Sequence, residues 1–146
     1  MAEAGDAMAQ SNLGNMYFNG DGVAQDYAAA AGWYRKAAEQ GDAYAQSILG
    51  SMYDNGTGVA QDDAAAVSWY RKAADQGYAS AQHNLGVMYT NGQGVAQDYV
   101  QAHKWFNLSA ASGNADALKN RDIVASKMTP AQIAEAQRLA SAWQQK

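Results

Sequence analysis

Residues 13–26 read LGNMYFNGDGVAQD, and nearly the same string returns as LGSMYDNGTGVAQD at 49–62 and as LGVMYTNGQGVAQD at 85–98. Glycines stand at the same 36-residue interval throughout the chain: Gly5, Gly41, Gly77 and Gly113. Self-similarity at a fixed period of this length is typical of proteins built from stacked repeats. The repeat therefore decides the fold.

Each repeat predicts two helices. The first runs from Asp6 to Asn19 and ends at Gly20, since a glycine after the last turn stops a helix. The second begins at Asp26, whose carboxylate can accept the free backbone N–H groups of the first turn, and ends before Gly41. One antiparallel pair cannot bury both its apolar faces, so neighbouring pairs must stack.

A second string closes each repeat: WYRKAAEQG from Trp33, WYRKAADQG from Trp69 and WFNLSAASG from Trp105. The combined pattern resembles the Sel-one-like repeat, a relative of the tetratricopeptide repeat. The shared pieces are LGxxY at Leu13, Gly14 and Tyr17, and Ala30 four residues before Tyr34. The resemblance covers residues 2 to about 117, and it implies a superhelical adaptor for other proteins.

We expect an all-α fold, a right-handed α/α superhelical solenoid of antiparallel helix pairs with a C-terminal capping helix. Residues 1–146 are expected to form a single repeat domain, with repeats at about 5–40, 41–76 and 77–112. The segment 113–146 is expected to hold a degenerate repeat and the cap, because a Thr129-Pro130 helix start replaces the usual loop.

The ends of the repeats carry two further signs. Leu108 and Ala111 stand where earlier repeats have Lys36 and Glu39, as expected if a cap helix covers that face. At the other end, residues 2–3 align with the tail of a second helix. The simplest interpretation is a fragment of a longer array or a truncated first repeat.

Composition excludes several classes of protein. The chain has no cysteine, which excludes disulfides, thiol chemistry and cysteine-ligated zinc. Its net charge of -4 argues against general nucleic-acid binding, which needs a basic face. No apolar run approaches the ~18 residues of a membrane span, so no membrane insertion is expected. No signal segment starts this chain.

No residue pattern predicts catalysis. The glycine-rich loops lack the strand and the Lys-Ser/Thr pair of a phosphate loop and the carboxylates of a calcium loop. Only two histidines occur, His83 and His103, too few for a metal site. We expect no enzyme activity, no cofactor and no metal.

Three recurring features are predicted to be structural. Gly14, Gly50 and Gly86 lie inside helices, at a cost of about 1 kcal/mol each relative to alanine. Close contact with a bulky Trp or Tyr of a neighbouring helix would offset this cost. The tryptophans that open the second strings are expected to be core residues, and the loops structural turns.

One side of each first helix varies between the copies. At 100° per residue, the identical positions fill an arc from about 80° to about 260°, measured from Met8, and the variable ones fill the rest. In tetratricopeptide-like solenoids such a free stripe lines the concave surface. The predicted partner-binding groove comprises Met8, Ser11, Asn12, Asn15, Phe18, Tyr44, Ser47, Ile48, Ser51, Asp54, Ser80, His83, Asn84, Val87 and Thr90.

This groove is nearly uncharged and mixes small polar residues with apolar and aromatic anchors, which favours a neutral peptide or helix as partner over nucleic acid or a polyanion. The first hypothesis is therefore a scaffold or adaptor that binds a peptide or protein in the concave groove. The alternative is a bacterial envelope protein that binds or processes a small cell-wall fragment. We expect a monomer, with end-to-end association through the exposed N-terminal repeat as the alternative. The residues leave the localisation unknown; the family resemblance implies a periplasmic, envelope-associated or secreted protein.

Overall fold

The computed structural model describes residues 6–144 of the chain, and within them the backbone forms eight helices and no strand. The helices are α1 (Ala7–Asn19), α2 (Tyr27–Glu39), α3 (Ala43–Asn55), α4 (Asp63–Asp75), α5 (Ala79–Asn91), α6 (Tyr99–Ala111), α7 (Ala115–Ala125) and α8 (Pro130–Gln144). The predicted all-α repeat fold is confirmed. The tail of a preceding helix, expected at residues 2–3, lies outside the described residues.

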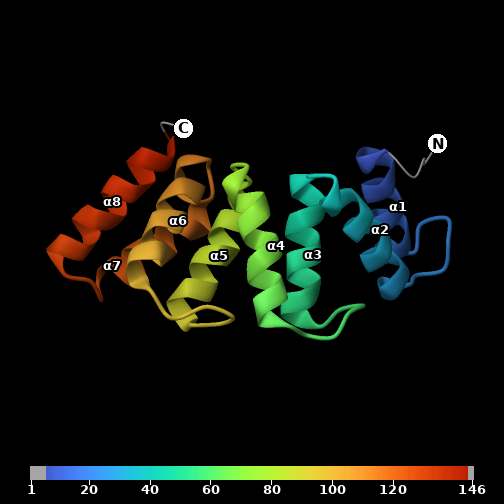
Figure 1. The fold of residues 1–146 in the computed structure, drawn as a ribbon, viewed down its shortest axis with the longest axis horizontal. Coiled ribbons are helices and arrows are strands. Elements are labelled where there is room, and N and C mark those ends of the chain that lie inside the picture. Colours follow the sequence, from blue (N-terminus) through green and yellow to red (C-terminus); the bar gives the residue numbers. More distant parts are fainter. Residues whose placement is uncertain (1–5, 145–146) are drawn as a thin grey trace. The chain divides into compact units, whose positions relative to one another are not determined.

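The helices fall into two compact units, Met1–Gln76 (unit 1) and Gly77–Lys146 (unit 2). In unit 1, α1 pairs with α2 and α3 pairs with α4, while α2 also packs against α3 (Figure 1). In unit 2, α5 pairs with α6, and α7 and α8 both pack against α6. Stacked helix pairs therefore make up unit 1, and unit 2 follows the same plan through α7.

The helix ends lie where the capping residues place them. Asp26 Oδ1 accepts a hydrogen bond from the Ala29 N–H at 3.1 Å and so begins α2. Gly20 ends α1 in the left-handed conformation, at φ 74°. The loop after it is tied back by Gln25, whose Nε2 donates to the Phe18 carbonyl at 2.9 Å. The recurring GxGVAQ segment is thus a structural turn, as predicted.

The helical glycines make the predicted close contact. A Cβ on Gly14 would lie 2.7 Å from the ring of Tyr34, and one on Gly50 would lie 2.8 Å from the ring of Tyr70. In unit 2 the partner of Gly86 is Phe106, at 2.6 Å. Each of these rings lies against the helix backbone in space that a side chain at the glycine position would occupy.

The tryptophans correct one expectation. Trp105 is buried, with 3% of its surface exposed, but Trp33 and Trp69 are only half-buried. The Lys36 and Lys72 ammonium groups lie over their rings, 4.5 Å and 5.2 Å from the centroids. The fully buried aromatic side chain is instead the next residue along each helix, because that position faces the helix glycine.

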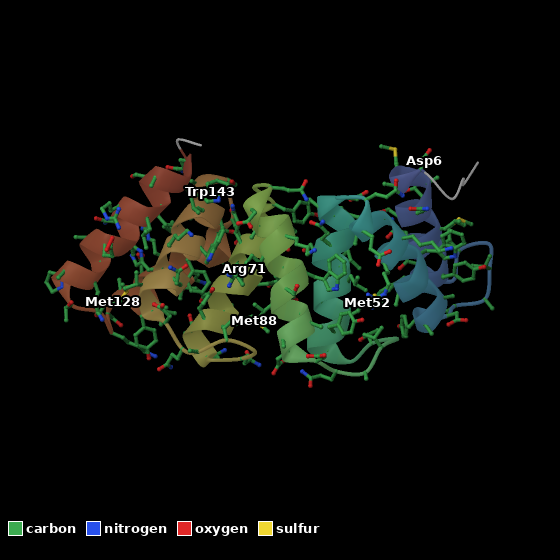
Figure 2. All side chains as sticks on the ribbon, viewed as in Figure 1. Asp6, Met52, Arg71, Met88, Met128 and Trp143 are labelled. Atoms are coloured by element: carbon green, nitrogen blue, oxygen red, sulfur yellow. The ribbon has the colours of Figure 1, made fainter. Side chains whose placement is uncertain are left out.

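The expected cap covers Trp105. Trp143 of α8, labelled in Figure 2, packs edge-on against the Trp105 ring with the centroids 6.2 Å apart. Ala136 and Ala140 of α8 are buried, and so is Leu108 of α6. Helix α8 packs on α6 instead of pairing with α7, so it differs from the second helix of a full repeat.

Candidate functional site

The predicted groove residues of unit 1 differ in their accessibility. Met8, with 72% of its surface exposed, and Asn12 and Tyr44 are exposed. Another five are half-buried: Asn15, Phe18, Ile48, Ser51 and Asp54.

Two serines do not belong to an open surface. Ser11 and Ser47 are buried, and the Ser11 hydroxyl donates to Asp42 Oδ2 at 3.3 Å. Ser11 lies within the variable arc and near the start of α1. Asp42, the N-cap of α3, lies against it, and the angular analysis of one helix did not include this neighbour.

The remaining stripe of unit 1 surrounds two adjoining hollows that share Phe18 and Ile48. The first, of about 180 Å³, is lined by Asn15, Phe18, Asn19, Tyr34, Tyr44 and Ile48. The second, of about 90 Å³, is lined by Phe18, Ile48, Ser51, Met52, Asn55 and Thr57. We call this pair the Phe18–Ile48 hollow. Each part is smaller than the ~300 Å³ at which small-molecule pockets begin, so single side chains fit it better than a cofactor.

The amide of Asn15 has a fixed orientation at one wall of this hollow. Its Oδ1 accepts hydrogen bonds from the Tyr34 hydroxyl at 2.5 Å and from the Tyr44 hydroxyl at 2.9 Å. Burial raises the pKa of the Tyr34 hydroxyl, which therefore stays protonated and keeps donating. The Asn15 NH₂ group has no partner within residues 6–144 and remains able to donate to a carbonyl.

Asp54 of α3 does not line the hollow itself, but two residues near it in the helix do. Ser51, one turn before it, and Asn55, next to it, both line the hollow. Its Oδ2 accepts a long hydrogen bond, 3.4 Å, from the Tyr70 hydroxyl. Burial and then the Asp54 charge raise the pKa of Tyr70, so this hydroxyl also remains a donor.

Unit 2 has a separate hollow of about 250 Å³ between α5, α6 and α7. It is lined by Val87, Thr90, Asn91, Phe106, Asn120, Ile123 and Val124. A neighbouring depression contains His83, whose Nε2 is 2.8 Å from the Asn120 amide nitrogen. The predicted residues Ser80, which is exposed, and Asn84, which is half-buried, do not line this hollow.

Sequence reasoning missed the α7 side of this hollow. Ile123 has 55% of its surface exposed, although it is a large apolar residue. It occupies the repeat position of Asn15, Ser51 and Val87. Aligning the degenerate repeat with the stripe positions would have identified it.

No group of three His, Asp or Glu side chains within residues 6–144 is placed to hold a metal ion. In the same part of the chain, no helix is both long and apolar enough to cross a bilayer. The Phe18–Ile48 hollow and the unit 2 hollow between α5, α6 and α7 are lined by apolar and neutral polar side chains, whereas the depression at His83 also contains Asp116 and Lys119.

Comparison with known families gives a specific match. The Sel1 repeat model matches three successive segments, residues 7–42, 43–78 and 79–114. The chain belongs to the Sel1 repeat family. Sel1 repeat proteins are generally non-catalytic scaffolds for protein–protein interaction, and they typically bind other proteins.

Solved Sel1 repeat structures resemble the chain closely. A protective antigen of uropathogenic Escherichia coli with an SLR fold is 40% identical, with a TM-score of 0.90 over 97% of this chain and 30% of that one. A Sel1 repeat protein from Oxalobacter formigenes is 38% identical, with a TM-score of 0.79 over 81% of this chain and 49% of that one. The cysteine-rich protein B of Helicobacter pylori is 25% identical, with a TM-score of 0.66 over 77% and 87%.

The chain spans about a third of the first of these proteins and about half of the second. No protein with a curated function matches it significantly. Membership of the Sel1 family therefore establishes the fold and suggests an interaction scaffold, and the partner is a matter for proposal.

One Sel1 repeat position carries an unusual residue. His103 in α6 is buried where α2 has Ala31 and α4 has Val67, and its Nδ1 has no hydrogen-bond partner within residues 6–144. Burial, and then the Arg121 charge, lower the pKa of His103 below its ordinary value.

This position predicts acid sensitivity. Because the pKa of His103 is lower in the folded chain, the unfolded chain takes up a proton at higher pH. The part of the free energy of unfolding that depends on neutral His103 is fully present above about pH 6.5. It is lost as the pH falls through the lowered pKa of His103 in the folded chain. Between about pH 8 and about pH 5, the melting temperature should fall more for the wild type than for His103→Val. Equal falls in the two proteins would show that His103 does not contribute.

Proposed function

We propose that the chain is a non-enzymatic adaptor that binds a peptide segment of another protein at the Phe18–Ile48 hollow of unit 1. The supporting observation is the Asn15 amide, which two tyrosine hydroxyls orient beside two apolar side chains. An apolar partner side chain would fill the hollow, while the Asn15 NH₂ group would donate to a carbonyl of the partner backbone.

This combination suits a peptide. Apolar anchors that enter small preformed hollows supply most of the affinity of protein contacts, and neighbouring polar groups fix the register of the bound chain. The exposed Tyr44 adds contact area with few rotatable bonds and lies edge-on to Tyr34, with the centroids 6.5 Å apart. The unit 2 hollow, with Val87, Thr90 and Ile123, is proposed as a second contact of the same kind.

The test is selection of short random peptides on the wild-type chain, followed by titration calorimetry with the selected peptide. Replacing Tyr44 by alanine should weaken binding by about 1–3 kcal/mol. Filling the hollow with Ser51→Trp should abolish it. Both variants should keep a cooperative thermal transition near that of the wild type, because neither residue belongs to the buried core.

Met16→Ala is the matched control. Met16 is an exposed apolar residue of α1, but it lies on the arc that is identical between the repeats and not on the variable arc. It should bind the peptide as the wild type does. Peptide binding that is indifferent to both hollow variants would place the site elsewhere. Affinity for cell-wall glycan fragments in the absence of any selected peptide would favour the envelope alternative.

A further inference from the structure

The carboxylate of Asp54 is placed where helix geometry disfavours it. It lies in the last turn of α3, at the negative end of the helix dipole, where cations and not anions stabilise a helix. The equivalent positions in the other repeats are the uncharged Phe18 and Thr90. The charge of Asp54 therefore opposes the dipole of α3 instead of stabilising this end of the helix.

Asp54 is also unneutralised. It is half-buried, and no Lys or Arg within residues 6–144 forms an ion pair with it. Its contact with the Tyr70 hydroxyl is long, at 3.4 Å, and brings no positive charge. A partly desolvated carboxylate without a cation gains more from an incoming positive charge than a fully hydrated one does.

The surrounding unit carries the same sign of charge. Residues 1–76 contain ten acidic side chains against four basic ones. Three of these four cations lie over aromatic rings: Arg35 over Tyr53, Lys36 over Trp33 and Lys72 over Trp69. Unit 1 is thus acidic as a whole, which steers cationic segments towards it.

We propose that the segment bound by unit 1 carries a lysine or arginine close to its apolar anchor. The anchor occupies the Phe18–Ile48 hollow, and the cation pairs with Asp54, which is next to the lining residue Asn55 along α3. This inference rests on the proposed function and adds the partner's chemistry: a basic-apolar peptide and not a neutral or acidic one. The sequence had favoured a neutral partner because the stripe as a whole is nearly uncharged.

The experiment compares peptide selections on three forms of the whole chain. The wild type should enrich peptides that combine Lys or Arg with an apolar residue. Asp54→Asn should keep the apolar preference and lose the cationic one, and Ser51→Trp should lose both. For the best wild-type peptide, Asp54→Asn should raise the Kd about three- to tenfold, with a weaker salt dependence.

Two controls separate recognition from folding. Glu39→Gln also removes one negative charge from unit 1. Glu39 is the last residue of α2 and does not line the Phe18–Ile48 hollow, so this variant should leave the Kd unchanged. Asp54→Asn should melt at the wild-type temperature or above it, because the carboxylate opposes the dipole of α3. A variant that binds less tightly and folds at least as stably identifies Asp54 as a recognition residue.

The possible failures are distinct. Hollow-dependent peptides that show no cationic preference, or an Asp54→Asn chain that binds them equally well, would overturn this inference and leave the proposed function standing. An equal effect of Glu39→Gln would reduce the preference to general charge attraction and also overturn it. If no selected peptide depends on the hollow, the proposed function fails, and this inference fails with it.

Discussion

Tyr70→Ala should lower the free energy of unfolding by about 3–5 kcal/mol, the usual cost of removing a fully buried aromatic side chain. The Tyr70 ring is 1% exposed and fills the space that Gly50 leaves open on α3. Alanine would leave a cavity between the two helices of one pair, and neither helix can move in without losing its contacts elsewhere. Urea denaturation followed by far-ultraviolet circular dichroism measures the change.

The adjacent residue is the control. Trp69→Ala should cost only about 1–2 kcal/mol, because the indole is half-buried and its outer face meets the Lys72 ammonium group. Equal losses for the two neighbours would show that the tryptophan is a core residue after all. A loss below about 1 kcal/mol at Tyr70 would contradict the ring–glycine contact.

Removal of residues 129–146 should have the second large effect. Without α8, the Trp105 ring and Leu108 on α6 lose their cover, and a large apolar patch is exposed. Exposed patches of this kind drive self-association. The truncated chain should form dimers or larger species in light scattering and should melt at a lower temperature than the complete chain.

Point variants test the same contact without removing a helix. Ala136→Asp places an unpaired carboxylate at a fully buried position and should cost about 3 kcal/mol or more. Arg138→Ala, on the exposed side of α8, loses only an ion pair with Glu135 and should change stability by less than about 0.5 kcal/mol. If the truncated chain stays monomeric and equally stable, α8 does not act as a cap.

The features that could be predicted from the sequence are those set by neighbours along the chain. Asp26 caps α2 and Gly20 ends α1, because both effects act within one helical turn. The contact of Gly14 with an aromatic ring was predictable too, since three copies pair a helix glycine with a large residue at the same spacing.

The features that were missed depend on residues distant in sequence. Ser11 lies on the variable arc of α1, but the start of α3 covers it. Trp33 and Trp69 recur at a fixed period, but only Trp105 is covered by α8. Ile123 joins the unit 2 hollow through the stacking of α7 on α6. An angular analysis of one isolated helix contains none of these neighbours.

In the aromatic residue that packs on each helix glycine, the ring carbons and the hydroxyl oxygen have different roles. Ring carbons contact the glycine and hold the helix pair together, and the phenyl ring in α6 does this as well as the phenol rings in α2 and α4 do. The single oxygen is left over for the groove: in Tyr34 it holds the Asn15 amide, and in Tyr70 it faces Asp54. Where Phe106 lacks that oxygen, the neighbouring groove position is the apolar Val87. The presence or absence of this one oxygen therefore changes the hydrogen bonding at one groove position of each repeat, and ligand preference can diverge between repeats while the ring–glycine contact stays the same.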